Sequence, residues 1–257
     1  MQYPKITVVT CSYNQGRFLE ECILSVINQQ YPNLEYIVMD GGSTDNSVEI
    51  IRKYEEYLTY WTSERDGGQS DALARGFERS TGEILAWLCS DDLLEKGALV
   101  EVGRFFSEHS NVDVVFGDAI FIDANSKITR YYKTLPFRRW LMLNTANYVP
   151  QPSTFWRRRA YFEVGGLDRS LHLSMDPDLW MRLAKVTQLR HVRRYWSRMR
   201  FYPEIKSLAL KDQRLAEHRR LENIYLGNRS VGARAVTRAT AKVARIAWRV
   251  CVGCYWK

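Results

Sequence analysis

The sequence predicts an α/β fold with a Rossmann-like, mostly parallel sheet. Its first half alternates short runs of β-branched and aromatic residues with helical patterns, which is typical of βαβ units around a buried sheet. The chain of 257 residues is 46% hydrophobic and 26% charged, and these fractions exclude a disordered, collagen-like or coiled-coil protein. We therefore expect a large α/β domain with helices on both faces of the sheet.

Strands and helices alternate regularly in the first half. The predicted strands are Ile6–Cys11, Leu34–Asp40, Tyr60–Ser63, Ile84–Leu88 and Val112–Gly117. The predicted helices are Arg17–Gln29, Ser47–Tyr57, Asp71–Arg79 and Gly97–Ser107. In the first helix, Phe18, Cys22 and Val26 recur at helical spacing, so this face is expected to be apolar and buried.

The pattern changes from Ala119 onward. Two short strands, Ala119–Ile122 and Lys127–Lys133, flank the turn-forming residues 123–126 and predict a hairpin. Further along, Asp176 and Pro177 indicate the start of a helix, because proline suits the first turn and a carboxylate complements the helix dipole.

Positive charge is concentrated near the C-terminus. Residues 1–185 carry 20 basic and 25 acidic side chains, whereas residues 186–257 carry 17 basic and 4 acidic ones. We predict a main domain over residues 1–206 and a basic helical appendage over residues 207–257. Such an appendage favours contact with an anionic surface, either phospholipid or nucleic acid.

The last helical pattern is amphipathic. Its basic stripe is Arg234, Arg238, Lys242, Arg245 and Arg249, and its opposite stripe is Val236, Ala239, Val243, Ala247 and Val250. Two interpretations stay open. Either the apolar stripe packs on the main domain with the arginines in solvent, or residues 231–257 lie on an anionic membrane with Trp248 and Trp256 at the interface.

The cysteines and the N-terminus suggest a compartment. Cys11, Cys22, Cys89, Cys251 and Cys254 are too few and too scattered for a disulfide framework, and no histidine has ligand spacing near the last two. No run approaches the roughly 18 apolar residues of a membrane span, and no signal-peptide core precedes the first strand. We expect a cytoplasmic protein, peripheral to the inner face of the membrane if the last helix binds lipid.

Carboxylates, not glycine-rich loops, follow the predicted strands. Ligands of parallel α/β sheets bind at the carboxyl ends of the strands. The loop over residues 10–16 lacks the glycine patterns of dinucleotide-binding proteins and of P-loop NTPases, which argues against both classes. Asp40 follows the second strand instead, and Asp91 and Asp92 follow the fourth.

The Asp91-Asp92 pair suggests a metal site. Two adjacent carboxylates repel each other, and a cation keeps both ionised. Magnesium binds through one or two carboxylates together with substrate phosphates, which suits a site without histidine. The alternative is that the pair caps a helix over Leu93–Leu99.

Several short motifs occur in a characteristic order. They are Thr10–Asn14 (TCSYN), Asp40–Asp45 (DGGSTD), Asp66–Ala72 (DGGQSDA), Ser80–Glu83 (STGE), Ser90–Asp92 (SDD), Gly165–Asp168 (GGLD) and Asp176–Trp180 (DPDLW). In these motifs the chain closely resembles the inverting nucleotide-sugar glycosyltransferases of family 2, which have the GT-A fold. The resemblance covers roughly residues 5–207.

The resemblance implies a donor subsite. Asp40 resembles the carboxylate that accepts a hydrogen bond from a uracil N–H, and Tyr13 the aromatic residue that stacks on the base. Asp91 resembles the residue that binds the ribose, and Asp92 the ligand of a Mg²⁺ or Mn²⁺ ion that bridges the diphosphate. Thr10 and Asp71 lie in the matching motifs and are assigned to the nucleotide sugar as well.

The resemblance also implies a catalytic base and an acceptor subsite. Asp176 resembles the general base that takes the proton of the acceptor hydroxyl, with Asp178 as the alternative. A single carboxylate opposite the leaving group implies one displacement with inversion. Gln151 and Trp180 resemble acceptor-binding residues, although Trp180 is equally suited to core packing.

Two positions depart from the family pattern. Many members have a metal-binding histidine where this chain has Tyr202, and a neutral phenol is a poor ligand for a hard divalent cation. Arg75 replaces a lysine of the usual third motif, and we leave open whether it contacts phosphate or solvent.

These observations predict a metal-assisted transferase. It would move a sugar from a nucleotide donor, with UDP the favoured nucleotide, to a glycan or lipid-linked hydroxyl. The alternative is a non-catalytic sugar-nucleotide or glycan-binding protein of the same fold. Nucleic acid is not expected as a partner, because no nucleic-acid module surrounds the basic tail.

Overall fold

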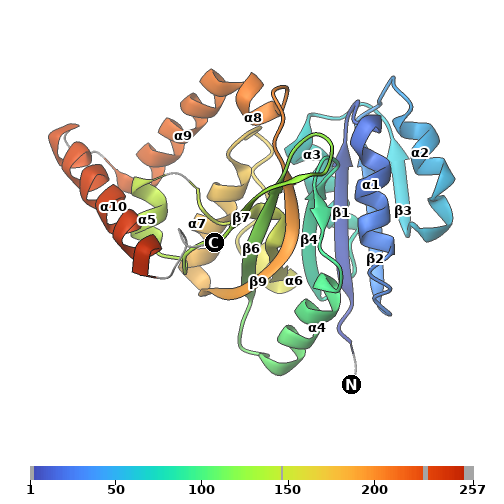
Figure 1. The fold of residues 1–257 in the computed structure, drawn as a ribbon, viewed down its shortest axis with the longest axis horizontal. Helices are drawn as coiled ribbons and strands as arrows, with labels where there is room; N and C mark the ends of the chain where they lie inside the picture. Colours follow the sequence, from blue (N-terminus) through green and yellow to red (C-terminus); the bar gives the residue numbers. More distant parts are fainter. Residues whose placement is uncertain (1–2, 146, 228–230, 252–257) are drawn as a thin grey trace.

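The structure is a computed structural model that describes residues 3–145, 147–227 and 231–251 (Figure 1). Its strands are β1 Ile6–Ser12, β2 Leu34–Asp40, β3 Tyr60–Ser63, β4 Ile84–Cys89, β5 Leu93–Leu94, β6 Val114–Ile122, β7 Ile128–Tyr132, β8 Thr154–Arg157 and β9 Leu189–Arg200. Its helices are α1 Gly16–Ile27, α2 Ser47–Lys53, α3 Gln69–Arg79, α4 Ala98–Glu108, α5 Arg139–Asn144, α6 Arg158–Glu163, α7 Met175–Val186, α8 Lys206–Ala209, α9 Lys211–Leu226 and α10 Val231–Cys251. Two 3₁₀ turns are Glu55–Tyr57 and Gln151–Ser153.

The predicted α/β sheet is confirmed. The strands are ordered β3-β2-β1-β4-β8-β6-β9-β5, with β7 paired to β6. The pairs β3-β2, β2-β1, β1-β4 and β6-β9 are parallel, whereas β8 is antiparallel to both β4 and β6. The carboxyl ends of the four consecutive parallel strands therefore meet at one edge.

The second half differs from the prediction in three places. The predicted strands over Val112–Gly117 and Ala119–Ile122 are one continuous strand, β6, which forms the expected hairpin with β7. The strands β8 and β9 were not predicted. No helix begins at Leu93, because the residues after Asp92 form β5 and α4 starts at Ala98, so the helix-cap interpretation of the Asp91-Asp92 pair is wrong.

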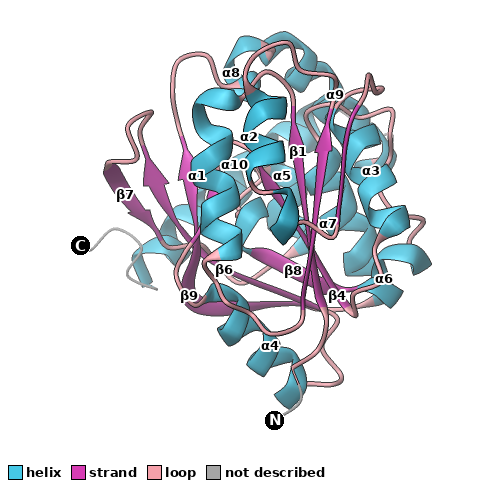
Figure 2. Ribbon diagram, turned by 90° about the vertical axis from the view of Figure 1, so that its right-hand side faces the viewer, coloured by secondary structure: helices cyan, strands magenta, loops and turns pink. Residues whose placement is uncertain are grey.

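Helices cover both faces of the sheet (Figure 2). Alternate residues of β1 point to opposite faces, so Val8 belongs to a core cluster with Leu19 of α1 and Leu99 of α4. Val9 belongs to the other cluster, together with residues of α3, β8 and α7. Because both faces are buried, the strands read as continuous apolar runs.

The C-terminal helices pack on the remainder of the chain. Leu221 of α9 and Ala241 of α10 are buried, and Trp248 packs against the same core cluster. The division at residue 206 stays a prediction, but these contacts join α9 and α10 to the main domain.

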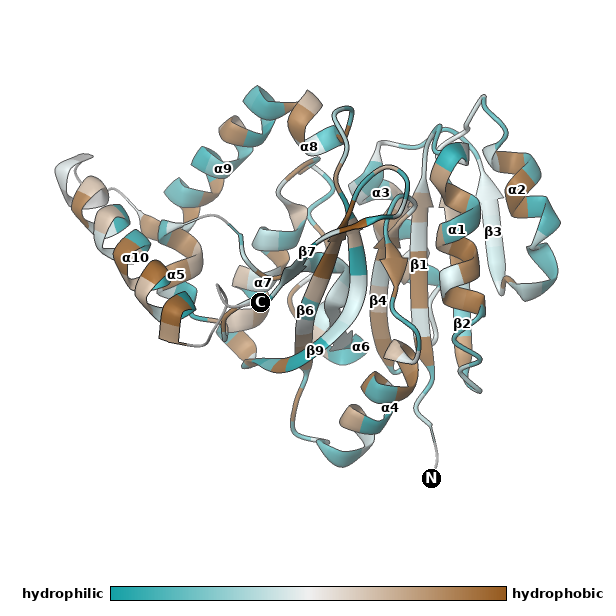
Figure 3. Cartoon of the chain, viewed as in Figure 1, coloured by the Kyte–Doolittle hydropathy of each residue, from teal (hydrophilic) through white to brown (hydrophobic). Residues whose placement is uncertain are grey.

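Hydrophobic and hydrophilic residues are interleaved along α10 (Figure 3), and it is the basic stripe that contacts the protein. Arg238 pairs with Glu222 of α9, and Arg245 and Arg249 lie over the rings of Tyr148 and Tyr132. The first of our two interpretations packs the apolar stripe on the domain, but its residues are exposed: Val236 by 68%, Val243 by 67% and Val250 by 49%, with Ile246 beside them at 56%. The side chain of Arg234, and the residues Cys254 and Trp256, lie outside the described part. Within residues 3–145, 147–227 and 231–251, no helix is long and apolar enough to cross a membrane.

Candidate active site

A large cleft lies at the carboxyl ends of β1 to β4. Its volume is about 1090 Å³, and it is bordered by the loops after β1, β3 and β4, by the start of α7, and by the end of β9 with α8. The predicted site residues that line it are Tyr13, Asp91, Asp92, Gln151 and Asp176. Five residues from four separate segments of the chain therefore share one cavity.

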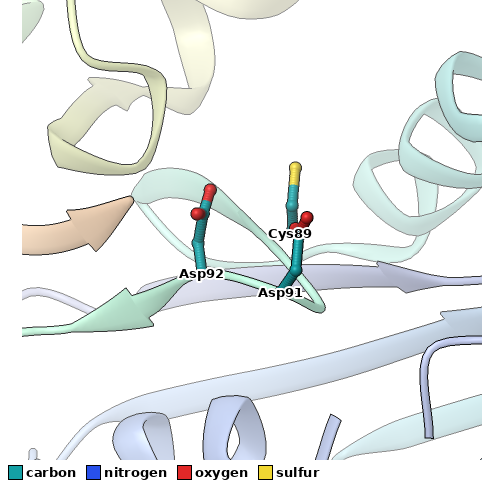
Figure 4. Close-up of side chains that lie close together, drawn as sticks. All are labelled: Cys89, Asp91 and Asp92. Carbon is teal, nitrogen blue, oxygen red and sulfur yellow. The ribbon is translucent and has the colours of Figure 1, made fainter. Parts of the chain in front are cut away.

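The side chains of Asp91, Asp92 and Cys89 form a cluster in the cleft (Figure 4). One ligand atom from each of the three side chains lies within 4.8 Å of the others, and all three project to the same side of the loop that follows β4. Burial raises the pKa of Asp91, and burial together with the charge of Asp91 raises the pKa of Asp92. A bound cation would favour the ionised forms.

Cys89 contributes packing to this cluster, not charge. Its Sγ atom lies 3.2 Å from Nε2 of Gln69 and donates to Oε1 of Gln151 over 3.7 Å. Contact with Cys11 and burial raise the pKa of the Cys89 thiol well above its usual value. The protonated thiol is a poor ligand for a hard cation, so the oxygen atoms of Asp91 and Asp92 are the better donor set.

The end of β9 holds the acidic loop in place. The backbone N–H of Arg200 donates to Oδ1 of Asp92 over 2.8 Å, and its Nε donates to the carbonyl oxygen of Asp91 over 2.8 Å. The Arg200 side chain is 1% exposed and pairs with Glu21 at 2.7 Å. Its positive charge lowers the pKa of both aspartates, which partly offsets their burial.

Tyr202 lies in the cleft, at the position where the family pattern has a histidine. Its hydroxyl donates to Oδ2 of Asp91 over 3.0 Å, and its ring packs on Phe18 with 5.0 Å between the ring centroids. The phenol therefore positions Asp91. Burial and the Asp91 charge raise the pKa of Tyr202, so the hydroxyl stays protonated and acts as a donor.

Asp176 lies in the first turn of α7, on another side of the cleft. Its Oδ2 accepts a hydrogen bond from Nδ2 of Asn147 over 2.6 Å. Burial raises the pKa of Asp176 from 3.8 to about 7. A carboxylate with this pKa is well matched to proton abstraction near neutral pH.

The two predicted acceptor residues lie in different surroundings. Gln151 lines the cleft and is held by a hydrogen bond from its Nε2 to the carbonyl oxygen of Trp87, 2.8 Å long. Trp180 is fully buried and stacks on Trp87 with the rings 5.8 Å apart. Its surroundings are those of a core residue.

Three residues assigned to the donor do not line the cleft. Thr10 is fully buried, with its hydroxyl 3.1 Å from that of Tyr36. Asp40 is 1% exposed and is bonded within its own loop. Asp71 accepts hydrogen bonds from Arg169 and from the backbone of Gly67.

The alternatives left open above can also be placed. Asp178 is buried, pairs with Arg182 and accepts a hydrogen bond from the hydroxyl of Tyr225, so it faces away from the cleft. Arg75 pairs with Glu64 and does not line the cleft. Neither residue is positioned to contact a ligand there.

Lys206 and Glu217 were not predicted from the sequence, and of the two Lys206 lines the cleft. Lys206 of α8 donates to Oε1 of Gln69 over 3.0 Å and to the carbonyl oxygen of His172 over 2.8 Å, so it closes one side of the cleft. Behind this side, the carboxylate of Glu217 binds the backbone just before α7. Lys206 follows Tyr202 by four residues, so a position near the cleft could have been expected, whereas no local pattern marks Glu217.

The fold and the cleft together define a class of enzyme. Residues 7–166 match the family described as Glycosyl transferase family 2, so the chain belongs to this family. It is a glycosyltransferase, and its α/β sheet is that of the GT-A fold.

Relatives and solved structures agree with this assignment. The chain is 29% identical to an uncharacterized glycosyltransferase of Mycobacterium tuberculosis over 187 residues, which cover 72% of this chain and 71% of that protein. It is 28% identical to a PGL/p-HBAD biosynthesis glycosyltransferase of Mycobacterium bovis, with 75% and 76% covered. TarS of S. aureus, solved with UDP-GlcNAc, has a TM-score of 0.70 at 18% identity, and the match covers 92% of this chain and 71% of the TarS chain. The mannosyltransferase PcManGT of Pyrobaculum calidifontis, solved with GDP-Man and Mn²⁺, has a TM-score of 0.66 at 17% identity, with 98% and 76% covered.

Proposed function

We propose that this enzyme transfers a sugar from a nucleotide-sugar donor, with UDP as the favoured nucleotide, to the hydroxyl group of a glycan or lipid-linked acceptor, with inversion. The observation that carries the proposal is the shared cleft, in which Tyr13, Asp91 and Asp92 lie at the strand ends and Asp176 lies on α7. Structural neighbours solved with UDP-GlcNAc and GDP-Man support a nucleotide-sugar donor.

Each residue has a distinct role in this proposal. Tyr13 stacks on the base with its exposed ring, Asp91 binds the ribose, and Gln151 contacts the acceptor. Asp176 takes the proton of the acceptor hydroxyl as that oxygen attacks the anomeric carbon. Because one carboxylate acts on the side opposite the departing nucleotide, the configuration at the anomeric carbon inverts.

The donor set fits a divalent metal ion. Asp92 offers hard oxygen ligands, and the raised pKa values of Asp92 and its neighbour Asp91 mark a site where a cation would stabilise both charges. Mg²⁺ or Mn²⁺ bound there would offset the charge that develops on the nucleoside diphosphate. The Tyr202 hydroxyl donates a hydrogen bond to Asp91, so we expect no metal ligand from its position.

We also propose that the enzyme is cytoplasmic and that α10 attaches it to an anionic membrane. The exposed residues Val236, Val243, Ile246 and Val250 follow helical spacing and form one apolar stripe. Lys242 is exposed beside this stripe, and no acidic residue occurs in residues 223–257. If a second copy of α10 packed against this stripe, its cations would lie near those of the first copy and repel them. Anionic lipid instead supplies both an apolar interior and the opposite charge.

A panel of nucleotide sugars tests the main proposal. We expect a donor to raise the unfolding temperature in the presence of Mn²⁺, because a ligand that binds only the folded state stabilises it by mass action. The same donor should release its nucleoside diphosphate when a suitable acceptor is added. Binding without release, across a panel of glycan and lipid-linked acceptors, would instead identify a non-catalytic sugar-nucleotide-binding protein.

A further inference from the structure

Both carboxylate oxygen atoms of Asp40 are engaged within the core next to its own loop. Its Oδ1 accepts a hydrogen bond from the Ser43 hydroxyl over 2.6 Å. Its Oδ2 accepts from the Ser63 hydroxyl over 2.6 Å and from the backbone N–H groups of Ser43 and Gly42 over 2.9 and 3.2 Å. Since the residue is 1% exposed and does not line the cleft, its role is to shape the loop after β2.

A different carboxylate occupies the space next to this loop. Gly41 follows Asp40 and has no side chain, and a Cβ atom placed on it would lie 3.1 Å from Oδ2 of Asp66. Asp66 lies in the loop after β3, the strand that pairs with β2, and lines the cleft together with Tyr13 and Gly41. The glycine leaves room for a carboxylate that enters from the neighbouring strand.

The Asp66 carboxylate is fixed at one oxygen atom. Its Oδ1 accepts a hydrogen bond from the backbone N–H of Gly68 over 2.7 Å. None of the described residues donates a hydrogen bond to Oδ2. The exposed ring of Tyr13 borders the same cleft, so Oδ2 of Asp66 is an acceptor that a base stacked on this ring can use.

We infer that Asp66, and not Asp40, reads the base of the donor nucleotide. This inference rests on the proposed function. An ionised carboxylate only accepts hydrogen bonds, so it selects a base with an imino N–H at that edge, as in uracil, thymine and guanine. Cytosine and adenine carry a lone pair at the corresponding ring nitrogen, and this lone pair is repelled by the carboxylate. Asp66 therefore determines the class of nucleotide.

The test compares nucleoside diphosphates of matched size. Binding of UDP, CDP, GDP and ADP to the full chain is measured by calorimetry in the presence of Mn²⁺. We expect UDP to bind better than CDP, and GDP better than ADP, by about tenfold or more, because an unmade hydrogen bond leaves a polar group unpaired. Asp66→Asn offers both a donor and an acceptor, so it should largely abolish these preferences.

Two further variants complete the test. Glu64→Gln removes the same charge from an exposed residue of the same loop and should retain the preferences. Gly41→Ala should weaken UDP binding, because its Cβ atom must displace the Asp66 carboxylate. If Asp66→Asn keeps the wild-type preferences, or if the wild type prefers CDP, the assignment of Asp66 is wrong. If the wild-type protein binds none of the four nucleotides, the proposed function itself fails.

Discussion

The carboxylate of Glu217 accepts a hydrogen bond from the backbone N–H of Ser174 over 2.9 Å, two residues before the proposed base Asp176. The same carboxylate accepts hydrogen bonds from the N–H groups of His172 and Leu173, each 2.9 Å long. An anion at this place also complements the dipole of α7. Helix α9, which we assigned to the appendage, thus fixes the start of the helix that carries the base.

We expect Glu217→Ala to lower the free energy of unfolding by about 1–3 kcal/mol, because one buried and two partly buried N–H groups lose their acceptor. Its kcat should fall while the KM for the donor changes little, since Asp91 and Asp92 lie on other elements. Denaturant unfolding and steady-state kinetics would measure both effects. Glu222→Ala is the matched control on the same helix, because Glu222 binds Arg238 of α10 and should leave kcat unchanged.

Asp92→Asn should abolish metal-dependent donor binding. The amide oxygen can still accept the hydrogen bond from the backbone of Arg200, so the fold should survive. Removing a buried charge next to Asp91 should even raise the unfolding temperature of the metal-free protein at pH 8. Calorimetry with a nucleotide sugar, in Mn²⁺ and then in EDTA, checks the first expectation, with Asp168→Asn as the control outside the cleft. Donor affinity that EDTA does not alter in the wild type would contradict the metal assignment.

Sugar transfer should depend on pH through Asp176. A general base must be deprotonated, so the rate should rise roughly tenfold per pH unit below about 7 and level off above it. Asp176→Asn should reduce transfer by roughly 10² to 10⁴ and leave donor binding intact. A rate of transfer that matches the wild type would assign the base elsewhere.

The same carboxyl group should affect stability. Its folded pKa of about 7 exceeds the value of 3.8 that it has when unperturbed, so between these values the folded state binds more protons than the unfolded state. The stabilising contribution is present at low pH and is lost as pH rises through about 7. The free energy of unfolding should therefore fall more between pH 5 and pH 8 in the wild type than in Asp176→Asn.

Tyr202→Phe should weaken donor binding by about three- to tenfold, which corresponds to the roughly 1 kcal/mol of one hydrogen bond. The variant removes the donor to Asp91, whose pKa should rise further, and it keeps the ring that packs on Phe18. Binding titrations at several pH values would show that the variant needs a higher pH than the wild type to reach its full donor affinity. An unaltered affinity would mean that Asp91 does not need this partner.

The exposed stripe of α10 should be required for membrane attachment. A double variant, Val243→Glu with Ile246→Glu, should abolish sedimentation with phosphatidylglycerol-containing vesicles, because charge on the apolar face opposes insertion. Arg245→Gln is the control, since Arg245 lies over Tyr148 of the protein itself. Release by Arg245→Gln, but not by the double variant, would show that the arginine stripe binds the lipid. Transfer to a short soluble acceptor should be unaffected by the double variant.

The first half of the fold could be predicted because its strands and helices follow one another along the chain. β9 could not, since Leu189–Arg200 contains Arg190, Arg193, Arg194, Arg198 and Arg200, and this charge hides the strand pattern. The strand is stable in the fold because Arg198 pairs with Glu95 and Arg200 with Glu21, both far away in the sequence.

The candidate site could be predicted only in part. Asp91 and Asp92 were found because they directly follow a strand, and they do line the cleft. Asp40 was assigned to the base from its motif, but hydrogen bonds within its loop cannot be read from the motif. Asp66 follows the third strand at the same edge, and this position was an available signal. The stripe of α10 that faces the protein is set by Glu222 and by two tyrosines, which no periodicity shows.

The position of β5 has a consequence for synthesis on the ribosome. β5 directly follows Asp92, and its ladder partner is β9, which ends at Arg200. A nascent chain that has emerged only as far as residue 166, the end of the family match, contains the loop with Asp91 and Asp92. It lacks Arg200, which holds this loop, the proposed base Asp176, and β9, which pairs with β5. We therefore expect the emerging polypeptide to bind no donor until Arg200 has left the exit tunnel, and to transfer no sugar until Glu217 has followed, although most of the sheet can form earlier.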